Sequence, residues 1–225
     1  MRRGTAQPIL GESEERAAWQ VQSLLLGYPD AALLDSLPML ARVASALPVA
    51  VGAPLQRMLT YLETTRPLTT ASAYVDTFDQ RKRFSPYLTW FFCGDTRRRG
   101  MALLKIKQVY LAAGLAPGDD ELPDHLAVAL EFAAAHPIPG RSLLEEHRAS
   151  IEVMRMALRD ADSPWAGVLE SVSATLRPLH GTEREAVVRL IADGPADEGV
   201  GLEPFAPPVH QPDMLGMPQM IGGRR

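Results

Sequence analysis

The chain has 225 residues, of which 46% are hydrophobic, and its formal net charge is −4. This size and apolar content allow one sizeable core, and we expect a single domain. The net negative charge argues against a dedicated DNA-binding protein, which usually carries a basic excess over its whole domain. Cys93 is the only cysteine, which excludes an intrachain disulfide and a self-contained cysteine-ligated metal or iron–sulfur site.

The beginning of the chain does not have the composition of an export signal. Arg2 and Arg3 are followed, up to residue 16, by only two strong hydrophobes, Ile9 and Leu10. No apolar run anywhere approaches the roughly 20 residues that span a bilayer. We therefore expect a cytoplasmic protein without direct membrane insertion, and the lone cysteine fits that reducing compartment.

Apolar residues recur at helical spacing through the first third of the chain. The helices predicted there span residues 13–26, 30–37, 38–47 and 55–66. Ser13 is the predicted N-cap of the first helix, and Gly27 follows its last turn. Because Pro38 suits a first-turn position, we expect it to separate two short helices.

The helical pattern continues to residue 192, with proline and glycine at the breaks. The helices predicted there span residues 70–78 (or 72–78), 85–93, 95–113, 120–136, 142–158, 163–172 and 182–192. Ser85 and Pro86 are the predicted N-cap and first residue of one helix, and Asp95 is the predicted N-cap of the longest. Pro137 and Pro139 are expected to stop the helix before them.

No segment has the alternating pattern of a strand, so we predict an all-α, single-domain helical bundle over residues 13–192. Residues 1–12 are expected to be a flexible N-terminus. Residues 193–225 are rich in proline and glycine, which predicts an irregular and mobile tail. The tail also contains apolar residues able to fold back over a groove: Phe205, Met214, Leu215, Met217, Met220 and Ile221.

Charge is distributed unevenly along the middle of the chain. Residues 81–107 carry eight cations against the single acid Asp95, whereas residues 119–146 carry seven acids against the single cation Arg141. Both blocks are compatible with solvated helix faces. Arg97, Arg98 and Arg99, however, fall at the predicted start of a helix, where the dipole disfavours cations. We therefore read this region as a docking surface that orients a charged partner.

No arrangement of residues indicates catalysis or a bound metal. The five histidines lack the spacing that places two imidazoles on one helical face, and Glu121 with His125 is one residue too long for a di-iron motif. There is no nucleophile elbow, no Walker-type phosphate loop and no dinucleotide fingerprint. Cys93, beside Phe92, is more typical of packing than of nucleophilic chemistry. We expect a protein that is not an enzyme.

Several ordered motifs resemble those of a known family. They are Leu24–Pro29, Tyr74–Asp79, Tyr87–Thr89, Gly94–Leu104, and Asp119–Leu126 followed by Leu130–Phe132. Together they resemble the assembly chaperones of respiratory nitrate reductase (NarJ-like), within the wider TorD-like group of molybdoenzyme chaperones. The resemblance covers roughly residues 14–192.

The resemblance implies an all-helical chaperone that binds the apo catalytic subunit of nitrate reductase, including its N-terminal segment. It implies that molybdenum cofactor and iron–sulfur clusters are inserted while the subunit is held in the cytoplasm, before it docks on the membrane. No cofactor would be permanently bound, although molybdopterin cofactor could be handled transiently. Proteins that deliver this cofactor are possible further partners, and nucleic acid is not expected as one.

We assign the partner contacts to residues of these motifs, by their chemistry. Apolar anchors of a helical peptide would lie on an aromatic floor made by Tyr74, Phe78 and Tyr87. Basic residues of the peptide would meet carboxylates at Asp79, Asp95, Asp120, Glu121 and Asp124. Acidic residues or cofactor phosphates would meet Arg97 and Arg99. His125, beside carboxylates, would make the affinity depend on pH. Plain core packing is the alternative for each aromatic residue.

Three other functions stay open from the sequence. The protein could serve a molybdoenzyme other than nitrate reductase. It could be a helical nucleic-acid-binding regulator that uses the basic block 81–107, in which case binding would be strongly salt-dependent. A helical hydrolase or oxidoreductase would require a metal or cofactor in the purified protein.

Overall fold

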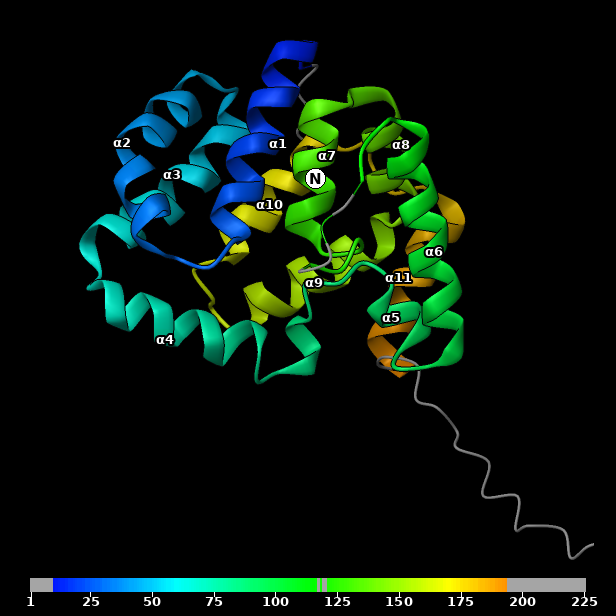
Figure 1. Ribbon diagram of the computed structural model, residues 1–225. Helices are drawn as coiled ribbons and strands as arrows, with labels where there is room; N and C mark the ends of the chain where they lie inside the picture. The colour runs from blue at the N-terminus through cyan, green and yellow to red at the C-terminus, as the bar shows by residue number, and fades with distance from the viewer. Residues whose placement is uncertain (1–9, 117, 119–120, 194–225) are drawn as a thin grey trace, which may run out of the picture.

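The computed structural model describes residues 10–116, 118 and 121–193, and its regular structure is helical (Figure 1). The helices are α1 (Glu12–Leu26), α2 (Ala31–Ala46), α3 (Val49–Thr64), α4 (Pro67–Phe78), the 3-10 turn η1 (Lys82–Phe84), α5 (Trp90–Cys93), α6 (Arg97–Ala112), α7 (Leu126–Ala135), α8 (Pro137–Glu146), α9 (Arg148–Asp160), α10 (Ala166–Thr175) and α11 (Gly181–Asp193). Within these residues the only extended pairing is one isolated bridge, between Tyr87 and His125. The predicted all-α fold is confirmed. Nearly all of the N-terminus predicted to be flexible, and of the predicted mobile tail, lies outside the described residues.

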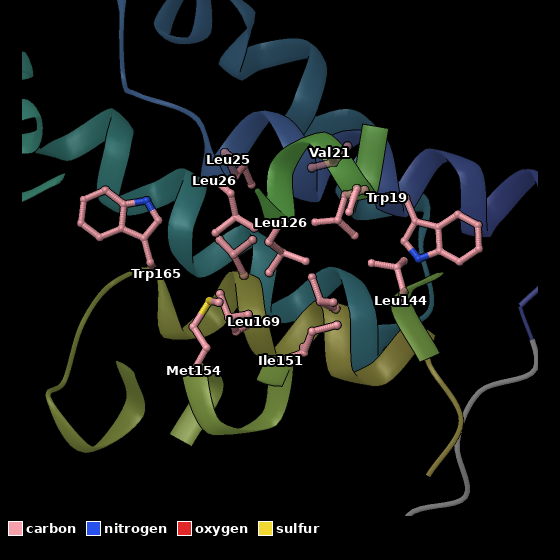
Figure 2. Packing of buried hydrophobic residues seen from close by; sticks show 14 of the residues in the cluster. Trp19, Val21, Leu25, Leu26, Leu126, Leu144, Ile151, Met154, Trp165 and Leu169 are labelled. Carbon is pink, nitrogen blue, oxygen red and sulfur yellow. The ribbon is translucent and has the colours of Figure 1, made fainter. Parts of the chain in front are cut away.

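The core forms where α1 packs against α7 and α10 near the middle of the molecule (Figure 1). Figure 2 shows side chains from α1, α7, α9 and α10 converging there: Val21, Leu25, Leu126, Ile151 and Leu169. The indoles of Trp19 and Trp165 close the two ends of this cluster, and both are at most 1% exposed. Full burial of aromatic rings contributes much of the apolar area removed from water on folding.

Polar side chains buried in the core join α1 to α10. Trp19 donates a hydrogen bond from Nε1 to Thr175 Oγ1 at 3.2 Å, and Gln22 donates from Nε2 to Ser171 Oγ at 2.8 Å. These bonds lie between residues about 150 positions apart in sequence. An unpaired buried donor costs roughly 1–3 kcal/mol. Any other packing of α1 that buried these donors without their acceptors would carry that cost, so the two hydrogen bonds favour the pairing of α1 with α10.

Three predicted helix boundaries were wrong. Pro38 lies inside the continuous helix α2, where it is exposed, so water can reach the carbonyl that its missing N–H leaves unpaired. Burial of Leu33, Leu37 and Leu40 on both sides of Pro38 stabilises the continuous helix. The predicted helix 142–158 is broken at His147, which separates α8 from α9. Pro137 ends the helix before it as expected, because α7 stops at Ala135, but it also begins α8, at a position that favours proline and before the predicted start at Ser142.

Other N-terminal boundaries are shifted by a few residues. Gly11 caps α1, and the Glu14 carboxylate accepts a hydrogen bond from its N–H at 2.8 Å. Thr96, and not Asp95, is the N-cap of α6. α4 begins at Pro67 instead of at residue 70 or 72. In the part of the chain that the structure describes, no helix is both long enough and apolar enough to cross a membrane.

Candidate functional site

Two short segments far apart in sequence pair with each other and organise the site. Leu88 N–H donates to the Asp124 carbonyl at 2.9 Å, and Leu126 N–H donates to the Pro86 carbonyl at 2.8 Å. The pairing places the Tyr87 and His125 rings edge to face, with centroids 5.3 Å apart. The helix predicted to start at Ser85 is therefore an extended turn, followed only by the single turn α5. Backbone partners from the 124–126 segment replace those that a helix would have supplied.

The paired segments and the end of α4 enclose a pocket of about 240 Å³, which we call the site pocket. It is lined by Tyr74, Phe78, Asp79, Pro86, Tyr87, Glu121, Leu122 and His125. Asp79 and Glu121 are both exposed at its edge, and no lysine or arginine is among the described residues that line it. The site pocket thus combines an aromatic interior with two carboxylates, which favours an apolar group carrying or adjoining a cation.

Packing behind the site pocket fixes the aromatic floor. The Tyr74 ring lies 4.9 Å from Phe78, and both rings pack edge-on against Trp165, at 5.6 and 5.5 Å. The Tyr74 hydroxyl donates to the Leu26 carbonyl at 3.1 Å. Burial, and then the nearby Asp79 carboxylate, raise the pKa of Tyr74 to about 12, so this hydroxyl stays protonated at neutral pH. Tyr74 and Phe78 therefore belong to both the core and the site pocket, as the two interpretations from sequence allowed.

Asp124 is fully buried and holds the turn instead of facing a partner. Its Oδ2 accepts hydrogen bonds from the Thr89 hydroxyl at 2.5 Å and from the Thr89 N–H at 3.3 Å. Arg99 Nη2 lies 3.8 Å from the same oxygen, and the guanidinium stacks over Tyr87 at 5.2 Å and over Trp90 at 5.6 Å. We expected Asp124 to contact a basic peptide directly. The structure contradicts this prediction, because the Asp124 side chain is not exposed to solvent.

His125 is half-buried and caps α7. Its Nδ1 accepts a hydrogen bond from the Ala127 N–H at 3.2 Å, so the ring is neutral with its proton on Nε2. Burial lowers the pKa of His125, while the charges of Glu121 and Asp124 partly oppose that effect. Protonation would remove the acceptor that caps α7 and would also place a cation at the edge of the site pocket.

The structure brings together six of the eleven predicted contact residues in the site pocket: Tyr74, Phe78, Asp79, Tyr87, Glu121 and His125. Arg99 and Asp124 lie beneath Tyr87 and support it. Asp95 and Arg97 are exposed near the start of α6 and do not line the pocket, and Asp120 lies outside the described residues.

Sequence reasoning missed three residues at this site. Pro86 and Leu122 line the site pocket, and Tyr28 packs edge-on against Tyr74 at 5.5 Å while its own side chain is 52% exposed. Tyr28 belongs to the family motif at residues 24–29, so its place in that motif was a usable signal. Leu122 likewise belongs to the motif at residues 119–126. Pro86 had no comparable signal, because the pairing that places it joins distant segments.

A second, larger pocket of about 560 Å³ adjoins the same loop. Its apolar lining comes from α6, α7 and the segment between them, including Tyr110, Leu115 and Phe132. Glu121 lines both pockets, and Glu131 adds a second carboxylate to the larger one. The Glu121 carboxylate therefore lies between the site pocket, with its aromatic floor, and a larger hollow that is mainly apolar. Among the described residues, no group of three or more His, Cys, Asp or Glu could hold a metal ion.

The model of the nitrate reductase delta subunit family matches residues 44–170, more than half of the chain. The chain belongs to this family. The matched range includes α4, the 86–88 segment and the 121–125 loop, which are the parts that form the site pocket. The family predicted from the ordered motifs is thereby confirmed.

Comparisons with individual proteins support the same family assignment. The nitrate reductase-like protein NarX of Mycobacterium tuberculosis is 40% identical over 159 residues, covering 70% of this chain but only 24% of NarX. A Bacillus subtilis protein assigned as the nitrate reductase molybdenum cofactor assembly chaperone NarJ is 32% identical over 176 residues, covering 76% of this chain and 94% of that protein. A crystal structure of an Archaeoglobus fulgidus protein assigned to redox enzyme maturation has the same fold. Its TM-score is 0.55 at 21% identity, and the match covers 77% of this chain and 97% of that one.

Proposed function

We propose that this delta-family protein is a cytoplasmic assembly chaperone for a nitrate reductase and is not itself an enzyme. It binds the apo catalytic subunit, in part through that subunit's N-terminal segment, which docks at the site pocket. The match with the Bacillus subtilis relative covers 94% of that protein, which is named as a probable nitrate reductase molybdenum cofactor assembly chaperone. In this account cofactor and iron–sulfur insertion take place while the chaperone is bound, and membrane docking follows its release.

The observation that carries the proposal is the composition of the site pocket. An aromatic floor is rigid, because Tyr74 and Phe78 are locked against Trp165, and a preformed floor lowers the entropic cost of binding an apolar anchor. Asp79 and Glu121 lie at the edge of the pocket, so cations beside that anchor would gain both attraction and orientation.

The adjoining larger pocket extends this logic to a peptide with two apolar anchors. Glu121 lines both hollows, so a cation between the two anchors would lie against its carboxylate. A helical segment places residues three and four apart on one face, which suits two anchors separated by about one turn. Glu131 would meet a second cation beyond the larger pocket.

The proposal is tested by calorimetric titration with a synthetic peptide of the catalytic subunit's N-terminus. We expect saturable binding with a negative heat-capacity change, the mark of buried apolar surface. Glu121→Lys should weaken binding about tenfold, equivalent to about 1.4 kcal/mol. Glu185→Lys makes the same charge change at an exposed position of α11 that lines neither pocket, and it should leave the affinity unchanged.

Two results would overturn the peptide mechanism. One is no binding at pH values on either side of the ordinary histidine pKa. The other is an equal loss of affinity in Glu121→Lys and Glu185→Lys, because that would indicate attraction to net charge alone. In either case binding of the folded apo subunit would have to proceed through another surface.

A further inference from the structure

The outward face of α6 carries apolar side chains that are largely exposed. Met101 is 69% exposed, Leu104 48% and Leu111 53%, whereas α6 is held to the body by Ile106 and Tyr110, each only 2% exposed. The Tyr110 hydroxyl donates to the Pro123 carbonyl at 2.8 Å and fixes the helix's rotation. Figure 1 shows α6 along one edge of the molecule.

The exposed residues have the spacing of a helix-docking seam. Met101, Leu104, Gln108 and Leu111 follow one another at intervals of three, four and three, which corresponds to the a and d positions of a heptad. Ile106 then occupies the f position, opposite the seam, in agreement with its burial in the body. α6 therefore has two apolar faces, one packed against the core and one that stays largely exposed among the residues that the structure describes. We call the second face the α6 seam.

Cations border the α6 seam on both sides. Lys105 and Lys107 take the e and g positions, where charges on adjacent helices meet, and both are exposed. Arg97 and Arg98 add positive charge at the N-terminal end, and α6 contains no aspartate or glutamate. Lys105 forms an exposed ion pair with Glu146 of α8, so a carboxylate can already lie on that side.

We propose that the α6 seam docks an amphipathic partner helix that has an apolar stripe bordered by carboxylates. Charge excludes the α6 seam of a second copy as the occupant, because it would bring only further cations against Lys105 and Lys107. A lipid surface is disfavoured because the seam is only two columns wide and holds the polar Gln108 at its centre. Interfacial helices instead bury a broad apolar face. A polar residue at one a position is typical of helix pairs whose register is fixed.

This surface is separate from the site pocket and does not rest on the proposed function. Arg99, which supports Tyr87 of the site pocket, lies on the inward side of α6. The α6 seam faces the other way, so a helix bound there would leave the pocket open.

The test uses two designed helical peptides of three heptads, both with leucine at a and d. One has glutamate at all e and g positions and the other has lysine, so like charges discourage each peptide from pairing with itself. Fluorescence anisotropy with the whole protein should show the acidic peptide binding about fivefold or more tighter than the basic one, a ratio in the range expected of a few exposed ion pairs.

Two variants and their matched controls locate the binding. Leu104→Gln with Leu111→Gln should abolish it, whereas Val188→Gln, an exposed apolar position of α11, should not change it. Lys105→Glu with Lys107→Glu should reverse the preference to the basic peptide, and Arg184→Glu with Arg189→Glu on α11 should not. All seven substituted residues are exposed, and circular dichroism verifies folding.

The proposal is overturned if neither peptide binds, if both bind equally, or if the Leu104 and Leu111 variant still binds. It is also overturned if the protein binds vesicles of equal parts phosphatidylcholine and phosphatidylglycerol through the same leucines and shows no preference between the peptides. That last result would reassign the seam to an anionic lipid surface.

Discussion

Helices α1 and α6 are of similar length but use their sequences differently. α1 buries eight of its fifteen residues, and its partners lie in α7 and α10, whereas α6 buries two of its sixteen. α1 also has acids in its first turn, where the dipole favours them, whereas α6 begins with three arginines. The contrast separates a helix that stabilises the fold from one whose apolar and basic residues are available to a partner.

The largest change in the free energy of unfolding should come from a substitution in α1. Trp19→Ala removes a fully buried indole and leaves the Thr175 hydroxyl without its donor. We expect a loss of about 3–5 kcal/mol in the free energy of unfolding, as for large core aromatic residues truncated to alanine. Urea denaturation measures it. Leu104→Gln on α6 is the comparison and should change stability by less than about 0.5 kcal/mol. Similar losses in both variants would remove the distinction between the two helices.

A smaller effect is expected where the site joins the core. Asp124→Ala removes the acceptor of two Thr89 hydrogen bonds and leaves Arg99 without its nearest carboxylate. We expect about 2–3 kcal/mol of destabilisation, typical of breaking a buried charged contact. Peptide affinity should fall only indirectly, through displacement of Tyr87. An affinity lost in full without any change in unfolding free energy would instead restore Asp124 as a direct contact.

His125 should make stability depend on pH. Burial lowers the folded-state pKa, so between this value and the ordinary value near 6.5 the unfolded chain binds more protons than the folded one. The contribution of His125 to the free energy of unfolding is therefore complete above the pKa of the unfolded chain. It is lost as the pH falls from that value to the lower pKa of the folded state. His125→Asn keeps a side-chain cap without titrating, so its unfolding free energy should vary less with pH over that range. Equal pH profiles for the two proteins would contradict this assignment.

The smallest effect is expected on the exposed side of α6. Lys105→Ala breaks the ion pair with Glu146, but the two side chains are 66% and 52% exposed. The stability change should not exceed about 0.5 kcal/mol, as for most surface pairs. Thermal unfolding at low and high salt checks it. A loss comparable to that of Asp124→Ala would mean that α6 depends on this pair for its position.

Most of the fold follows from local pattern, because apolar spacing and caps act over a few residues. The predictions fail where tertiary contacts override that pattern. Pro38 lies inside α2 because its neighbours are buried in the core, and residues 85–88 pair with residues 124–126 instead of forming a helix. Such outcomes depend on residues tens of positions away.

The candidate site was predictable in part, and mainly through family motifs. These motifs marked the aromatic residues and carboxylates that line the site pocket. They did not distinguish Glu121, exposed at the edge, from Asp124, buried three residues later. Both belong to one acidic block in sequence, and only the pairing of distant segments decides which carboxylate faces solvent.

Amide hydrogen exchange, with and without the catalytic subunit's N-terminal peptide, tests the central claim most directly. Without peptide, amides of α1 should exchange most slowly and those of α6 faster, in line with their burial. The peptide should slow exchange at residues 74–79, 86–89 and 121–127, around the site pocket. Protection confined to α6 or α11, with no change at these three segments, would contradict the assignment of the site pocket.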